Sequence, residues 1–337
     1  MLRRLHSLPG LVIAAMLVVA ATSGAVLSID PVAERLANPV ASGTSVADLA
    51  QAVAGRHQVV DRISVRPSGA VTASYTDGED SGVERVDPAT GASLGAFEVS
   101  GFTRFVTNLH RSFLLGDAGR AGSAIAAFGM LVLTLSGAGL LARRLGGWRA
   151  ALRPIRGDAA QRWHAELSRF AVLGLLLTSL TGVWMSAETF GLVPETAPSQ
   201  PIYSASGGAP SPVRSLAALA CIDVSELREL TFPEIDDPRD VFKLRTAQGE
   251  AIIDQATGAM LAFTPSTILE RVQETVRMLH TGRGASLLAI LLGVSAACVP
   301  ALGATGIAIW LRRRLRDPHK QRGVARRFRR YDHPRRQ

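Results

Sequence analysis

Residues 161–187, QRWHAELSRFAVLGLLLTSLTGVWMSA, decide the fold because they join a histidine to an apolar segment long enough to cross a membrane. The 18 residues from Phe170 to Ala187 carry no charge and rise about 27 Å as a helix, close to the thickness of a bilayer core. His164 lies 18 residues, or about five helical turns, before Gly182, so both residues share one helix face. This face carries a candidate metal ligand near one membrane surface and bare backbone near the other.

The same arrangement recurs along the chain, which predicts an internal repeat. His6 precedes Gly24 by 18 residues, whereas His110 and His280 precede a Ser-Gly or Thr-Gly pair, at 136–137 and 305–306, by 25 to 27 residues. Residues 11–29, 121–142, 170–187 and 285–311 contain no Asp, Glu, Lys or Arg, and the chain has a positive mean hydropathy. These features predict a membrane protein with a four-helix transmembrane bundle built from two internal repeats.

The charges predict the orientation of the bundle. The N-terminus, residues 143–169 and the C-terminal tail together hold 21 of the 37 Lys and Arg residues but 4 of the 28 Asp and Glu residues. The positive-inside rule therefore predicts cytoplasmic termini and two exported loops, at 30–120 and 188–284. We interpret the basic segments as topology anchors that contact anionic lipid, with no nucleic-acid partner. MLRRLH with the apolar run after it also resembles a signal peptide, but the shared His-to-Gly spacing favours a retained helix.

The two exported loops repeat each other. Each has a short helical stretch followed by alternating apolar residues and turn signals, which predicts two small α+β domains. The match is clearest between VDPATGASL at 86–94 and IDQATGAML at 253–261. Asp87 and Asp254 precede Thr-Gly in these hairpins, so we interpret them as turn formers rather than catalytic carboxylates.

The motifs together resemble the PepSY-associated transmembrane helix family of bacterial inner-membrane proteins. The resemblance rests on LHSLPG and TSGAVLS in the first span, LHRSFLLGDAGR and LSGAGLLARR in the second, QRWHAELSR and SLTGVWMS in the third, and LHTGRGA and ATGIAIWLRRR in the fourth. It implies PepSY-like exported domains and similarity to ferric-siderophore reductases that carry haem between their helices. Longer relatives continue into flavodoxin-like and FAD/NADPH reductase domains. This sequence does not, so we expect flavin only on a separate partner, a cytoplasmic flavin reductase.

The predicted organisation has eight segments. They are a first transmembrane helix at 1–29, a PepSY-like domain at 30–109, a His-led helix at 110–142, a basic cytoplasmic loop at 143–163, a third helix at 164–187, a second PepSY-like domain at 188–279, a fourth helix at 280–311 and a basic cytoplasmic tail at 312–337.

This topology predicts one histidine pair at each membrane face. His6 and His164 begin the two outward-running helices, and His110 and His280 begin the two inward-running ones. A six-coordinate haem iron accepts two axial imidazoles, and small residues let helices approach the cofactor closely. By helical rise, the Ser/Thr-Gly pairs of the first and third spans fall at the depth of the periplasmic histidines, and those of the second and fourth spans at the depth of the cytoplasmic ones. The sequence therefore predicts two haems, with axial ligands His6, His164, His110 and His280 and packing residues Gly24, Gly137, Gly182 and Gly306.

The expected haem is of the b type. Cys221 and Cys298 form no CxxCH motif, which excludes c-type attachment. Arg111 and Arg283 follow the periplasmic ligands and are candidate contacts for the haem propionates, with a topology or surface role as the alternative. His57, His319 and His333 have no counterparts in the repeat, and we expect them to be solvated.

The expected function is electron transfer across the inner membrane, from a cytoplasmic flavoprotein to a periplasmic acceptor. The resemblance implies a ferric siderophore or another metal complex as acceptor, and hence a role in iron uptake. The alternative is a non-enzymatic membrane protein whose exported domains bind a peptide or regulate a partner. No nucleotide-binding loop, nucleophile elbow or pair of intramembrane carboxylates supports a hydrolase or a proton-coupled pump.

Overall fold

A computed structural model describes residues 1–38, 43–150, 153–194 and 201–315. The basic tail beyond residue 315, with His319 and His333, lies outside the described residues. The chain forms two compact units. The helical unit comprises Met1–Ala25, Leu109–Leu180 and Val294–Gln337, and the sheet unit comprises Val26–Asn108 and Thr181–Gly293.

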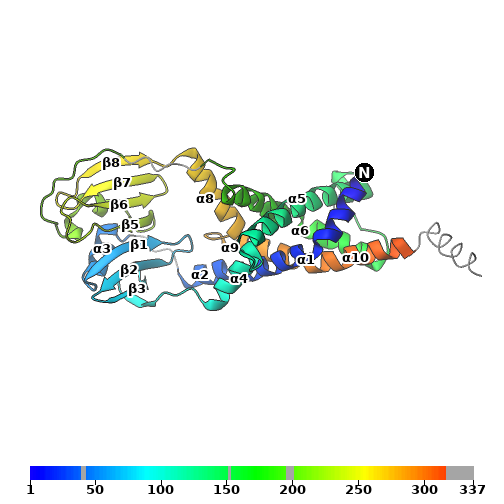
Figure 1. Ribbon diagram of the computed structural model, residues 1–337, viewed down its shortest axis with the longest axis horizontal. Coiled ribbons are helices and arrows are strands. Elements are labelled where there is room, and N and C mark those ends of the chain that lie inside the picture. The colour runs from blue at the N-terminus through cyan, green and yellow to red at the C-terminus, as the bar shows by residue number, and fades with distance from the viewer. Residues whose placement is uncertain (39–42, 151–152, 195–200, 316–337) are drawn as a thin grey trace, which may run out of the picture. The chain divides into compact units, whose positions relative to one another are not determined.

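Four helical stretches are long and apolar enough to cross a membrane, namely Leu2–Ala37, Gly116–Leu145, Ala159–Thr189 and Ser286–Leu315 (Figure 1). The first consists of α1 (Leu2–Leu27) and α2 (Ile29–Ala37), the second is α5 (Gly116–Leu145) and the third is α6 (Ala159–Thr189). The fourth is divided into α9 (Ser286–Ala297) and α10 (Val299–Leu315). Proline has no amide hydrogen to donate to a preceding helical turn, so it is tolerated in the first turn of a helix. Pro300 occupies such a position in α10. The prediction of a multi-pass membrane protein with four spans is confirmed.

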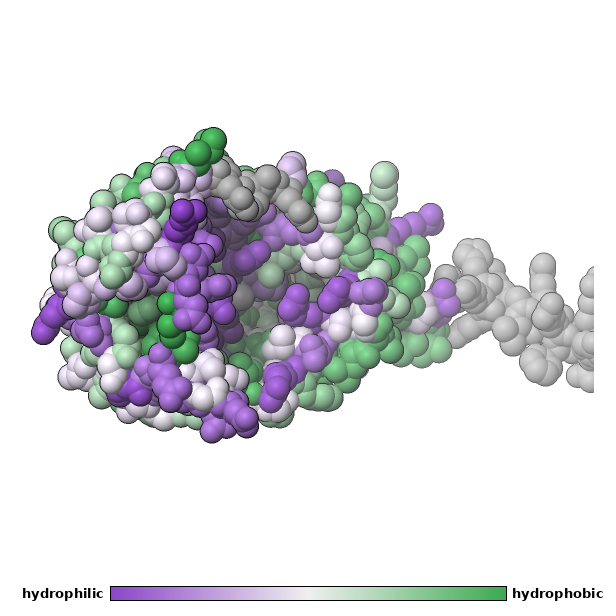
Figure 2. Space-filling model, turned by 60° about the vertical axis from the view of Figure 1, so that its left-hand side comes forward, coloured by the Kyte–Doolittle hydropathy of each residue, from purple (hydrophilic) through white to green (hydrophobic). Residues whose placement is uncertain are grey.

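The helical unit has a narrow core and an apolar exterior. Ile13 and Leu17 of α1 pack with Ala126, Ala171, Leu175 and Val299 from the other spans. Gly129 allows this close approach, because a Cβ there would lie 2.1 Å from Ile13 Cδ1. Large apolar side chains such as Val12, Phe128 and Leu173 are at least 60% exposed, and Figure 2 shows hydrophobic residues covering the helical surface. In a bilayer these side chains contact lipid.

The predicted His-led spans at 110–142 and 280–311 are wrong in one respect, because His110 and His280 lie in separate helices before the spans. His110 is near the end of α4 (Gly101–Ser112) and His280 near the end of α8 (Ile268–Thr281). Left-handed backbone at Phe113, Leu114 and Gly116 interrupts the helix after α4. A capping box at Thr267 and Glu270 starts α8, and Gly282 ends it at φ 68°.

The predicted helices at 1–29 and 164–187 differ from the structure only at their ends. The helix α6 begins at Ala159, five residues before His164. The helix α1 ends at Leu27, and α2 follows it almost directly. His6 and His164 thus lie in the second turns of α1 and α6, whereas His110 and His280 lie near the ends of shorter helices.

The sheet unit contains one eight-stranded antiparallel sheet (Figure 1). Its strands are β1 (Val59–Val65), β2 (Val71–Asp77), β3 (Asp80–Val86), β4 (Ser93–Ala96), β5 (Leu227–Thr231), β6 (Val241–Thr246), β7 (Gly249–Asp254) and β8 (Met260–Pro265). Their order is β4-β3-β2-β1-β5-β6-β7-β8. Buried residues of α3 (Val46–Ala54) and α7 (Ala217–Ala220) form one core with both halves of the sheet. Short 3-10 turns cover Trp148–Ala150 and Val213–Ser215.

Residues 30–109 and 188–279 do not form two separate domains. The central strands β1 and β5 pair antiparallel, with Ile63 opposite Leu230, and both side chains are fully buried. Each four-stranded meander has β1 or β5 as one edge strand, and pairing these two edges satisfies their backbone groups and joins their cores. Alternating polarity predicted each meander but carries no signal for edge-to-edge pairing.

Asp87 and Asp254 are turn formers, as their motifs predicted. Asp87 Oδ1 accepts hydrogen bonds from the amides of Ala89 and Thr90, and Asp254 Oδ1 accepts them from Ala256 and Thr257. A backbone bond from the Thr-Gly glycine back to the aspartate carbonyl closes each turn. These contacts fix the β3–β4 and β7–β8 hairpins.

Candidate functional site

The candidate site is built from histidines that each contact the Ser/Thr-Gly pair of another helix. His6 extends from α1 to α5, where its Nδ1 lies 3.1 Å from Leu133 O and 3.0 Å from Ser136 Oγ. His164 extends from α6 to α10, where its Nδ1 lies 3.1 Å from Leu302 O and 2.9 Å from Thr305 Oγ1. The two contacts are equivalent, because each combines a hydroxyl with the carbonyl three residues before it.

His110 and His280 make the same kind of contact within their own units. His110 Nδ1 lies 2.8 Å from Ala20 O and 3.2 Å from Ser23 Oγ of α1. His280 Nδ1 lies 2.9 Å from Thr181 Oγ1 of α6. The pairing of histidines and hydroxyls is the one expected from helical rise. Hydroxyls of the first and third spans contact His110 and His280, and hydroxyls of the second and fourth spans contact His6 and His164.

These contacts determine the tautomer of His6, His110 and His164. A carbonyl oxygen only accepts hydrogen bonds, so each Nδ1 must carry the proton and donate it. The lone pair of a neutral imidazole then resides on Nε2, the nitrogen available to a metal. In the described part of the chain, Nε2 of His6 and Nε2 of His164 make no hydrogen bond.

The glycines of three pairs contact the histidine rings. A Cβ at Gly24 would lie 3.0 Å from His110 Cε1, and one at Gly137 would lie 3.0 Å from His6 Cε1. At Gly306 the distance to His164 Cε1 would be 3.4 Å. Gly182 follows Thr181, the hydroxyl partner of His280. A glycine beside the hydroxyl thus leaves space for the flat ring to lie against the facing helix.

His6 and His164 are close enough to bind one metal ion. Their ring centroids are 6.3 Å apart and their planes are inclined by 81°. A metal–imidazole bond is about 2 Å long and a ring nitrogen lies about 1 Å from its centroid, so two axial imidazoles on one ion have centroids about 6 Å apart. The separation, the tautomers and the apolar surroundings fit a haem iron held by Nε2 of both residues.

The other expected contacts have a weaker structural basis. Arg111 ends α4 and Arg283 follows the terminal glycine of α8, and both are exposed. Trp163, beside His164, is 59% exposed and so fits a membrane-interface anchor. Cys221 and Cys298 are free thiols. Within the described residues, no group of three or more His, Cys, Asp or Glu side chains is arranged to hold a metal.

The sequence interpretation of His57 is wrong, because its side chain is only 10% exposed. Its Nδ1 lies 2.8 Å from Asp77 Oδ2, its Nε2 lies 3.0 Å from Glu84 Oε1, and its ring stacks on Tyr75. Burial favours the neutral ring, but the bonds to both carboxylates outweigh it and raise the pKa of His57. Asp77 and Glu84 belong to the β2–β3 hairpin, whereas His57 lies two residues before β1. The two carboxylates therefore reach His57 only when the strands pair.

Comparison with known proteins agrees with the motif analysis. A family model described as the PepSY-associated TM region matches residues 3–313. No curated protein and no solved structure matches the chain. The match extends from before His6 to beyond Gly306, so it includes all four histidines and all four Ser/Thr-Gly pairs. The chain therefore belongs to the PepSY-associated transmembrane family.

Proposed function

We propose that this protein is a b-type haem protein of the bacterial inner membrane that transfers electrons from a cytoplasmic flavin reductase to a periplasmic acceptor. The acceptor would be a ferric siderophore or another oxidised metal complex. The observation that carries the proposal is the His6–His164 pair, whose centroid distance of 6.3 Å suits two axial ligands of one iron. A bound haem would supply reversible one-electron chemistry.

The chain's own residues would hold and orient the cofactor. Leu133 O and Ser136 Oγ orient the ring of His6, and Leu302 O and Thr305 Oγ1 orient that of His164. Protonation of Nδ1 keeps Nε2 as the ligating atom, and the surrounding apolar spans exclude water. The sequence repeat extends the proposal to a second haem with His110 and His280, each of which is held by an equivalent hydroxyl.

The distribution of charges supports cytoplasmic termini. Residues 143–169, which comprise the connection between the second and third spans and the adjoining helix ends, hold seven arginines and two acidic residues. The positive-inside rule places such a loop in the cytoplasm. His6 and His164 would then lie at the cytoplasmic face, where a flavin reductase delivers electrons, and the sheet unit would be exported.

A reduced-minus-oxidised absorbance spectrum of the purified full-length protein tests the proposal. We expect the bands of a low-spin b-type haem after reduction with dithionite, and a pyridine haemochrome assay gives the number of haems per chain. A colourless protein, purified from cells supplied with haem and with all four histidines intact, would contradict it. That result would favour a non-enzymatic membrane protein whose exported sheet binds a peptide or regulates a partner.

The Ser136 hydroxyl should affect haem binding without being a ligand. Ser136→Ala removes one acceptor of the His6 Nδ1 proton and retains Leu133 O, so the tautomer persists while the imidazole becomes less basic. We expect haem affinity to fall about 10-fold and the midpoint potential to rise. Potentiometric titration and haem transfer to apomyoglobin measure the two effects.

Ser179→Ala is the matched control for Ser136→Ala. Ser179 is also a buried helical serine, and its hydroxyl bonds to Leu175 O and Leu176 O of its own helix. An equal change in potential in both variants would show that Ser136 acts only through helix packing.

A further inference from the structure

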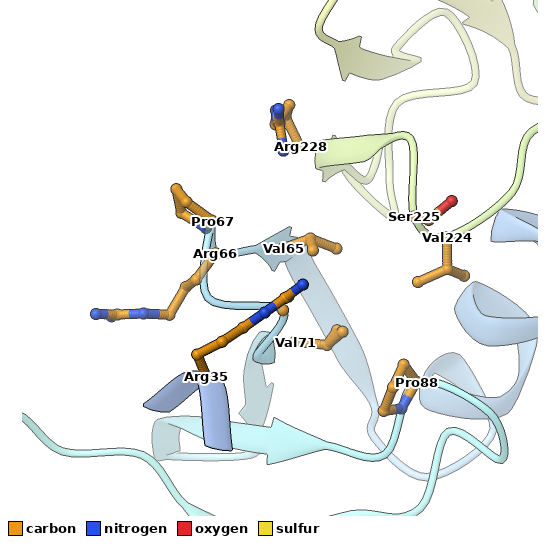
Figure 3. Close-up of a pocket in the computed structure, with 10 residues that line it drawn as sticks. Arg35, Val65, Arg66, Pro67, Val71, Pro88, Val224, Ser225 and Arg228 are labelled. Atoms are coloured by element: carbon orange, nitrogen blue, oxygen red, sulfur yellow. The ribbon is translucent and has the colours of Figure 1, made fainter. Parts of the chain in front are cut away.

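A pocket in the sheet unit is lined by three arginines and no acidic residue. It offers about 80 Å³ to the centres of water-sized molecules and lies between α2, the β1–β2 turn and the start of β5 (Figure 3). Val65, Val71 and Val224 form apolar walls around the arginines Arg35, Arg66 and Arg228. Apolar walls with a few converging polar groups are typical of a site for a small molecule.

Arg35 is the uncompensated charge of this pocket. Figure 3 shows its side chain extending from α2 toward Val65 and Val71. Gly69 allows this position, because its φ is +92° and a Cβ there would lie 3.4 Å from Arg35 Nη1. Among the described residues, Arg35 has no ion pair or hydrogen-bond partner. A partly buried guanidinium without an anion is costly, so it favours an anionic ligand.

Arg228 and Arg66 differ in how far they are neutralised. Arg228 Nε is buried and makes no hydrogen bond, although Glu274 Oε1 lies 3.5 Å away. Arg66 Nη2 pairs with Glu34 Oε1 at 3.0 Å, and its guanidinium lies 5.1 Å from the centre of the Phe97 ring. Figure 3 shows the Arg66 side chain directed away from Arg35. Arg35 therefore has no anionic partner among the described residues, whereas Arg228 contacts Glu274 through Nε only.

We propose that this pocket binds a small organic anion with at least two acidic groups. Arg35 binds one carboxylate or phosphate and Arg228 binds the other, because a guanidinium matches the paired oxygens of either group. The carbon skeleton of the ligand contacts Val65, Val71 and Val224. The headgroup of an anionic phospholipid offers the same oxygens, so a soluble anion and a lipid are the two sources to separate. The proposal does not depend on haem.

Isothermal titration with citrate tests the pocket, using the full-length protein in phosphatidylcholine nanodiscs at constant ionic strength. We expect saturable binding that Arg35→Gln and Arg228→Gln each weaken about 10-fold or more, because a charge-assisted hydrogen bond is lost. Arg35→Lys should give an intermediate affinity, since it keeps the charge but loses the paired geometry. If circular dichroism shows that Arg35→Gln is unfolded, the citrate affinity of Arg35→Lys tests the proposal instead.

Arg62→Gln is the matched control. Arg62 lies on β1, is 52% exposed, pairs with Glu229 at 3.4 Å and does not line the pocket. Its replacement should leave citrate affinity unchanged. Equal weakening by Arg62→Gln would mean that citrate senses overall charge, and would overturn the proposal.

Nanodiscs that contain phosphatidylglycerol separate the two sources of the anion. If the lipid headgroup occupies the pocket, wild-type affinity for citrate should fall in these nanodiscs, and Arg35→Gln should abolish the binding of phosphatidylglycerol. If a soluble anion is the ligand, citrate affinity should be equal in both nanodiscs. The absence of both saturable citrate binding and Arg35-dependent lipid binding would overturn the proposal.

Discussion

A His164→Ala variant is expected to lose the b-type haem spectrum of one site while keeping its helices. His164 supplies one of the two Nε2 atoms that the proposed iron requires, and its partner His6 cannot complete the axial pair alone. We expect haem content per chain to fall by about half if two haems are present, and to near zero if there is one. His6→Ala should give the same spectrum as His164→Ala, because the two residues serve one iron.

Chemical rescue separates lost ligation from lost folding. Millimolar imidazole should restore low-spin absorbance to His164→Ala, because the free ligand fits the space that the side chain leaves next to Gly306. His57→Ala is the matched histidine control, since this residue lies in the sheet unit and bonds to Asp77 and Glu84. A His164→Ala protein with unchanged haem content would contradict axial ligation by this pair.

An Asp254→Ala variant is expected to destabilise the β6–β8 part of the sheet by at least about 3 kcal/mol. The carboxylate is 1% exposed and accepts hydrogen bonds from the amides and hydroxyls of Ser206 and Thr257, as well as from the Ala256 amide. Alanine removes this buried acceptor and leaves the five donor groups without it. Hydrogen exchange of the full-length protein, read by mass spectrometry on peptides from residues 241–265, measures the local loss.

Asp87→Ala provides the matched control from the other half of the sheet. Asp87 occupies the equivalent turn but is only half-buried and accepts bonds from two backbone amides, Ala89 and Thr90. We expect a loss of about 1 kcal/mol there. Equal losses in the two variants would show that the turn alone, rather than the buried network around Asp254, sets the effect.

The Asp254 network also predicts a pH dependence. Burial opposes ionisation of this carboxyl, but hydrogen bonds from Ser206 and Thr257 outweigh it and hold the pKa of Asp254 far below its ordinary value. A group with a lowered folded pKa stabilises the protein fully above its unfolded pKa of about 4, and this contribution is lost as pH falls below that value. The difference in exchange protection between wild type and Asp254→Ala should therefore shrink below about pH 4.

Sequence patterns could predict the features that depend on local periodicity. Charge-free runs of 18 or more residues specified four spans, since a bilayer core leaves few alternatives for such segments. The spacing from each histidine to the next Ser/Thr-Gly pair placed the partners of His6 and His164 at the right depth, because helical rise converts residue number into distance. Alternating apolar residues and the Asp-x-x-Thr-Gly turns similarly indicated the hairpins.

The remaining features depend on contacts between distant segments. The hydroxyl of Ser136 bonds to its own helix and also lies next to His6, so its second role is visible only once α1 and α5 pack together. His57 looked solvated because Asp77 and Glu84 approach it only after β2 and β3 pair. The breaks that separate α4 and α8 from their spans depend on left-handed backbone at Phe113 and Leu114 and at Gly282, of which only the glycine is a recognisable signal.

The four spans, the hairpins and the family could be read from the sequence, because each is encoded in short-range pattern and composition. Three features became visible in the folded chain. Both halves of the sheet join through β1 and β5, hydroxyls and carbonyls set the histidine tautomers, and Arg35 faces a pocket without an acidic partner. Edge pairing, hydrogen-bond direction and charge compensation arise between segments that are far apart in the chain, so no local sequence pattern encodes them.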